Sequence, residues 1–113
     1  MRIIEKSISK KELRQLSVEA FGNLVKAVVD IEKEIMVIDA ELHADEEALL
    51  LSKGSRQIDL WGINLYPDLN DDEFIEYDSM INLRPNQGNT TRGIDNPEIR
   101  NKIKKIISQL VIK

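Results

Sequence analysis

The pattern of apolar and polar residues in the N-terminal part of the chain predicts a strand followed by a helix. A short apolar run over Arg2–Lys6 is typical of a strand. Ser9 and Glu12 then form a capping box, in which the Ser9 hydroxyl accepts a hydrogen bond from the Glu12 amide. Apolar residues follow at helical spacing as far as Gly22, a residue that can close a helix in a left-handed conformation.

Two apolar runs in the middle of the chain predict a pair of buried strands. Leu24–Ile31 and Ile35–Leu42 are rich in β-branched residues and carry apolar side chains on both faces. Strands of this kind usually lie inside a sheet that is covered on both sides. The short link between them predicts a hairpin. A helix is predicted over Ala44–Lys53, because three acidic residues lie in its first turn and glycine follows its end.

The C-terminal half predicts a second hairpin and a last helix. Ile58–Tyr66 and Glu73–Leu83 alternate as strands do, and the turn-forming residues between them predict a tight connection. Pro85–Ile94 is a polar loop. Asp95 or Asn96 caps the last helix. The apolar stripe of this helix consists of Ile99, Ile103, Ile106, Ile107 and Leu110.

The predicted order is strand, helix, strand, strand, helix, strand, strand, helix. At 113 residues the chain is predicted to form one domain over residues 1–113. We expect an α+β fold with a mostly antiparallel sheet of roughly five strands and with the helices packed chiefly on one face.

Composition and charge restrict the class of protein further. Hydrophobic residues make up 42% of the chain and charged residues 32%, which is typical of a folded soluble domain. There is no cysteine, and no apolar run approaches the roughly 18 residues of a membrane span, so we expect a cytoplasmic protein without a membrane segment. The net charge of -4 does not favour nucleic acid as a partner. No pattern predicts a cofactor.

The polar loop and the start of the last helix, residues 84–99, are the first candidate site. Arg84, Asn89, Thr90 and Arg92 supply positive charge and hydrogen-bond donors beside unpaired helix amides, an arrangement that suits an anionic ligand. The alternative is a surface loop whose polar side chains satisfy their own turns. Asp95 weighs against the anion site, because a capping carboxylate would already occupy the amides.

Glu76 and Asp78 are the second candidate site. They are alternate residues on one predicted strand face, and Asn64 or Asp59 is expected across the hairpin. Oxygen ligands at this spacing suit Mg²⁺ or Mn²⁺ in a metal-dependent hydrolase of phosphate esters. The alternative is the solvated polar face of an outer strand. His43, the only histidine, is interpreted as a junction residue and not as a general base.

Aromatic residues concentrate between positions 59 and 77, and they are interpreted as core or dimer contacts. They are Trp61, Tyr66, Phe74 and Tyr77.

Three segments of the C-terminal half resemble a family of small prokaryotic proteins known as a domain of unknown function. The segments read DLWGINLYP, FIEYDSMINLRPNQGN and IDNPEIRNKI. The resemblance implies a compact cytoplasmic domain, and it assigns no catalytic or binding residue.

Taken together, the patterns favour a non-enzymatic binding or interaction module that forms a homodimer through the second hairpin and takes a small anionic ligand at residues 84–99. The metal-dependent hydrolase that uses Glu76 and Asp78 is the alternative. A subunit that stabilises a larger complex is a third hypothesis, and it predicts an exposed apolar patch.

Overall fold

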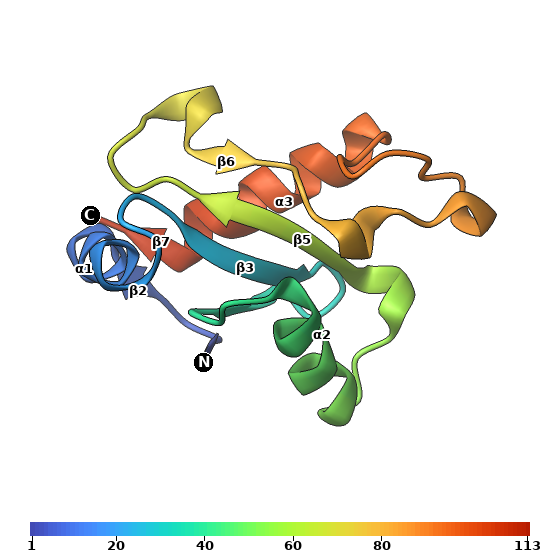
Figure 1. Cartoon of the computed structure of the whole chain (residues 1–113), viewed down its shortest axis with the longest axis horizontal. Coiled ribbons are helices and arrows are strands. Elements are labelled where there is room, and N and C mark those ends of the chain that lie inside the picture. Colours follow the sequence, from blue (N-terminus) through green and yellow to red (C-terminus); the bar gives the residue numbers. More distant parts are fainter.

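The protein folds as a five-stranded antiparallel sheet with three helices around it (Figure 1). The computed structural model describes residues 1–113. The sheet order is β1-β4-β3-β5-β6. These strands are β1 (Arg2–Ile4), β3 (Val25–Asp30), β4 (Ile35–Ile38), β5 (Leu60–Leu65) and β6 (Ile75–Glu76). The predicted α+β fold with an antiparallel sheet is therefore confirmed.

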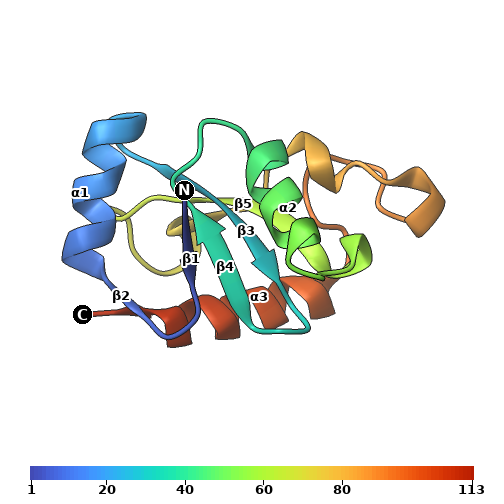
Figure 2. The same cartoon turned by 90° about the horizontal axis from the view of Figure 1, so that it is seen from below.

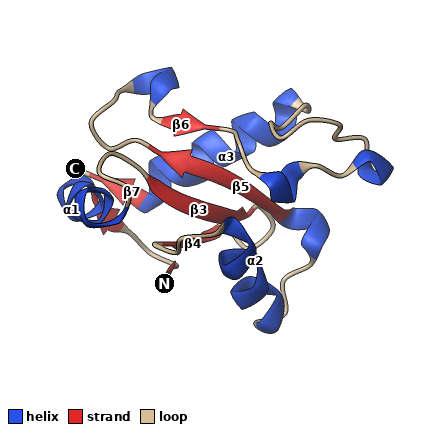
Figure 3. Cartoon of the chain, in the orientation of Figure 1, coloured by secondary structure: helices blue, strands red, loops and turns tan.

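Helices and a second, smaller sheet complete the chain. The helices are α1 (Lys10–Ala20), α2 (His43–Ser52) and α3 (Pro97–Leu110). A parallel pair of two-residue strands, β2 (Ile8–Ser9) and β7 (Val111–Ile112), lies apart from the main sheet (Figure 3). Short 3-10 turns occupy Gln57–Asp59, Asp71–Glu73, Met80–Asn82 and Pro85–Gln87. None of the three helices has the length and apolar character that a membrane crossing requires.

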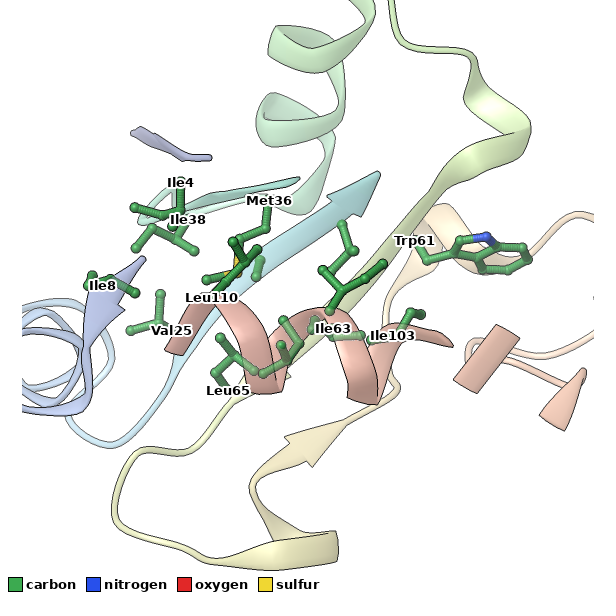
Figure 4. Packing of buried hydrophobic residues seen from close by; sticks show 14 of the residues in the cluster. Ile4, Ile8, Val25, Met36, Ile38, Trp61, Ile63, Leu65, Ile103 and Leu110 are labelled. Carbon is green, nitrogen blue, oxygen red and sulfur yellow. The ribbon is translucent and has the colours of Figure 1, made fainter. Parts of the chain in front are cut away.

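Each face of the sheet is covered by a different helix, α3 on one side and α2 on the other (Figure 2). The larger hydrophobic cluster includes Ala27 of β3, and it places Ile63 of β5 against Ile103 of α3 (Figure 4). The smaller cluster places Val28 against Leu50 of α2. Alternate residues of β3 thus enter opposite clusters, which explains why that strand is apolar on both faces. Packing of the helices chiefly on one face is not confirmed, because α2 covers the opposite face from α3.

The predicted ends of the first and last helices agree with the structure. The Ser9 hydroxyl accepts from the Glu12 amide at 3.1 Å, and Gly22 after α1 has a φ of +95°. The Asn96 side chain accepts from the Glu98 amide at 2.8 Å, and Pro97 occupies the first turn of α3.

The strand predicted over Glu73–Leu83 is mostly wrong, because only Ile75–Glu76 pairs with β5. Beyond Glu76, main-chain groups of β5 form hydrogen bonds with a side chain and not with a neighbouring strand. The Asn82 amide accepts from the Gly62 N–H at 2.8 Å and donates to the Gly62 carbonyl at 2.9 Å. Since one side chain satisfies both groups, no backbone strand is needed there, and the chain turns through a 3-10 segment instead.

Candidate functional site

Arg84, the first residue of the predicted anion site, is buried and bonded within the protein. Its guanidinium donates to the carbonyls of Ile81 at 2.8 Å and Gln57 at 3.0 Å, and also to the carbonyl of Leu60. It lies 4.5 Å from the centre of the Trp61 ring. Only 5% of Arg84 is exposed, so its donors face main-chain carbonyls and not solvent. Burial lowers the pKa of Arg84, and the nearby Glu47 carboxylate acts in the opposite direction.

Asn89 likewise serves the loop that contains it. Its amide nitrogen donates to the carbonyls of Asn82, Thr91 and Gly93 at 2.6–3.1 Å, and its oxygen accepts from the Asp95 amide at 2.8 Å. Every polar atom of this buried side chain is therefore used inside the chain.

The Asp95 carboxylate already occupies donors of Thr90 and Thr91. Asp95 accepts from the Thr90 amide at 2.9 Å and from the Thr91 hydroxyl at 2.8 Å. These two hydrogen bonds lower the pKa of Asp95. An anion at this loop would have to displace Asp95, so the anion site at residues 84–99 stays a prediction without support from this geometry.

The structure does bring Arg92 together with the second candidate pair. The Arg92 guanidinium lies 2.8 Å from Asp78, and 56% of the arginine side chain is exposed. The Asn64 amide donates to Glu76 at 2.8 Å and to the Asp78 carbonyl at 3.3 Å, as expected across the hairpin. The Tyr66 hydroxyl donates to the same Glu76 oxygen at 3.0 Å. Burial and the Glu76 carboxylate raise the pKa of Tyr66.

Asp59 lies away from this group, and its carboxylate pairs with Arg56 at 3.3 Å. The described chain holds no cluster of three histidine, cysteine or carboxylate side chains with metal-ligand geometry. Glu76 and Asp78 thus have Asn64 and Arg92 as neighbours, and no third carboxylate joins them. The hydrolase alternative remains a prediction for which these contacts supply no further ligand.

His43 and Lys26 extend this polar surface toward the start of α2. Lys26 pairs with Asn64 across the β3–β5 ladder, so the two side chains share the face of the sheet that α2 covers farther along. The His43 Nε2 atom lies 2.7 Å from the Ile63 carbonyl, which can only accept, so Nε2 carries the proton and Nδ1 is an acceptor. Burial lowers the pKa of His43 and outweighs the hydrogen bond to the Ile63 carbonyl, which acts in the opposite direction. The imidazole is therefore neutral near pH 7.

We call this surface the Asn64 face. Its members are Lys26, His43, Asn64, Tyr66, Glu76, Asp78 and Arg92.

A cleft with a mixed apolar and acidic lining borders the Asn64 face. It has a volume of about 440 Å³ and lies between the C-terminal end of α1 and the segment that joins β4 to α2. Phe21 and Leu42 line it and remain 45% and 56% exposed. The Lys26 ammonium lies 5.2 Å from the centre of the Phe21 ring, so the cleft and the Asn64 face are continuous. Its polar lining is acidic and consists of Glu19, Asp39 and Glu41.

Sequence reasoning missed this cleft because its residues come from separate elements. Phe21 and Leu42 end apolar stretches, where they look like ordinary boundary residues. One local signal could have marked the position: Asp39 follows an apolar strand directly and has a φ of +70°, a conformation that aspartate tolerates better than most residues.

The predicted aromatic cluster is divided by the structure. Trp61 is in the core with 4% exposed, while Phe74 and Tyr77 pack at the edge of the larger cluster. Tyr66 alone of the four lies on the Asn64 face.

The fold and this surface define a small α+β domain in which a polar sheet face adjoins a cleft with two exposed apolar side chains and an acidic lining. A family model described as "Protein of unknown function (DUF5674)" matches residues 2–110, and the chain belongs to this family. No curated protein and no solved structure matches the chain.

Proposed function

We propose that the protein is a non-enzymatic interaction module that binds a basic, apolar-containing segment of a partner protein. The binding surface would be the cleft between Phe21 and Leu42 together with the adjoining Asn64 face. The exposure of two large apolar side chains in one cleft carries this proposal, because such side chains gain most from being covered by a partner.

The charge of the surface supports a basic partner. Five carboxylates lie on the cleft and the Asn64 face, against the two cations Lys26 and Arg92. Arg92 already pairs with Asp78, and Lys26 already lies over the Phe21 ring. Lysine or arginine side chains of a partner would therefore meet chiefly Glu19, Asp39 and Glu41, the carboxylates of the cleft that make no salt bridge. The five carboxylates are Glu19, Asp39, Glu41, Glu76 and Asp78.

The same charge distribution argues against a second copy of the chain on this surface. A two-fold interface places identical patches against each other, so carboxylates would face carboxylates. The predicted homodimer stays a prediction, and we propose that it would use another surface. We also propose a cytoplasmic location, because the chain has no cysteine.

Titration with three matched sets of short synthetic peptides tests the proposal. The first set combines lysine or arginine with phenylalanine or leucine, the second replaces the basic residues by glutamate, and the third replaces the apolar residues by serine. In amide-resolved NMR, we expect saturable shifts at Phe21, Lys26 and Leu42 with the first set alone.

A double substitution and a matched control identify the surface. Phe21→Ser with Leu42→Ala should weaken the binding of the first set by roughly tenfold or more, since two exposed apolar contacts are lost. Ile58→Ala is the control, because Ile58 is 52% exposed and lies at the opposite end of β5. Equal binding by all three peptide sets, or an equal loss in the control, would contradict the proposal.

A further inference from the structure

We propose that the groove between β6, α3 and β7 is a binding site for a small amphipathic anion, a molecule with an apolar chain and one acidic group. The groove is separate from the cleft near Phe21, and its ligand is a small molecule, so this inference goes beyond the proposed function. It would give the domain a second, independent binding activity.

The size and floor of the groove suit an apolar chain. The cavity has a volume of about 610 Å³, within the range of roughly 300–1,000 Å³ that is common for small-molecule sites. Its floor contains the buried core residue Ile107 and three partly buried residues that pack against the larger hydrophobic cluster, Phe74, Ile75 and Val111. A ligand chain there would extend the core outward and remove apolar surface from water.

The groove is lined by three lysines, Lys10, Lys104 and Lys113, and by Asp71 and Asp72, so an acidic group would have to be received by the lysine side chains at the rim. Lys10, at the start of α1, has a neutral partner, since its ammonium lies 3.4 Å from the Asn70 Oδ1 atom and makes no salt bridge. It also lies 5.5 Å from the centre of the Phe74 ring, which places the cation beside the apolar floor. A carboxylate on Lys10 could therefore direct its apolar chain over Phe74.

The loop between β5 and β6 forms the outer wall of the groove, and a weak ion pair joins it to α3. Lys104 of α3 lies 3.4 Å from Asp72, whose side chain is 93% exposed. An exposed pair of this kind contributes about 0–1 kcal/mol, so a ligand acid can compete for Lys104 at little cost. The two lysines thus bracket the groove from α1 and α3, and neither is held by a strong partner.

Octanoate, octanol and acetate are the probes that separate the apolar and acidic parts of the recognition. In amide-resolved NMR at neutral pH, we expect octanoate to shift Phe74, Ile107 and Val111 in a saturable manner. Octanol should bind at least several-fold more weakly, because it lacks the charge, and acetate should cause no shift in the groove. Octanol that binds as tightly as octanoate would contradict the assignment of the lysines.

Lys11, which lies next to Lys10 but outside the groove, provides a matched control. Lys10→Gln should weaken octanoate binding by roughly tenfold, as for the loss of one charge-assisted hydrogen bond, whereas Lys11→Gln should leave it unchanged. Ile112→Asp places a carboxylate at a groove residue that is 47% exposed, and it should abolish octanoate binding without unfolding the protein. Equal losses in the Lys10 and Lys11 variants, or octanoate shifts that map outside the groove, would overturn the proposal.

Discussion

Because the carboxyl group of Glu46 is buried, we expect the stability of the folded protein to depend on pH. Glu46 lies in the first turn of α2 and is 0% exposed. One of its oxygens accepts from the Ala40 amide at 3.1 Å, and the other has no hydrogen-bond partner. Burial raises the pKa of Glu46 to about 9, so the folded protein keeps this group protonated at neutral pH.

The sign of the effect follows from comparing the folded and unfolded states. The folded pKa lies above the ordinary value of 4.5, so the contribution of Glu46 to stability is complete below about 4.5 and is lost as pH rises toward about 9. Each pH unit in that window lowers the free energy of unfolding by about 1.4 kcal/mol. At pH 7 the loss is about 3 kcal/mol.

Glu46→Gln removes the ionisable group while it keeps the shape and the acceptor for Ala40. We expect the variant to gain stability over the natural protein as pH rises, by about 1.4 kcal/mol between about pH 7 and pH 8. His43 does not affect the comparison between pH 7 and pH 8. Its pKa is lowered, so its contribution is lost only as pH falls below its ordinary value of 6.5.

Urea unfolding at several pH values, followed by Trp61 fluorescence, measures the difference directly. Asp45→Asn is the control, because Asp45 is an exposed acid in the same helical turn and should leave the pH dependence unchanged. If Glu46→Gln shows the same slope with pH as the natural protein, the carboxyl group is ionised in the folded state and the reasoning is refuted.

Two further predictions concern the edge of the sheet where side chains replace a strand. Arg84→Ala should lower the free energy of unfolding by about 3–5 kcal/mol, because it leaves buried carbonyls and Glu47 without their partner. Arg92→Ala, at the exposed pair with Asp78, should lower it by about 1 kcal/mol or less. Urea unfolding at neutral pH measures both values. Gly62→Ala should lower the free energy of unfolding by about 1–3 kcal/mol, because the added Cβ would lie 2.6 Å from the Ser79 Cβ atom. The double variant with Ser79→Gly should recover part of this loss, and a double-mutant cycle measures the recovery.

Periodicity predicted the elements whose apolar faces are continuous. The two-sided apolar pattern of β3 and β4 identified interior strands, and the caps at Ser9 and Asn96 located the starts of α1 and α3. These signals lie within a few residues of one another along the chain, so one sequence is enough to read them. The pairing of β2 with β7 joins distant residues over two positions and leaves no such signal.

The anion site at residues 84–99 was harder to predict than the strands and helices, because the sequence pattern does not distinguish a ligand-binding arginine from a structural one. Arg84 and Arg92 stand eight positions apart in the same polar stretch, yet one is 5% exposed and the other has a side chain that is 56% exposed. The difference arises from long-range contacts with Gln57 and Leu60, which a single sequence does not reveal.

The polar stretch after β6 is best understood as part of the scaffold. The outer edge of β5 is completed by β6 at Asn64 and Leu65 and by side chains at Gly62 and Leu60. Unpaired main-chain groups on a buried edge cost free energy, so a chain that leaves the sheet there needs asparagine and arginine side chains to satisfy them. The abundance of these residues reflects that need. The exposed apolar side chains on which the two proposed binding sites depend, Phe21, Leu42 and Ile112, lie where the local sequence looks ordinary.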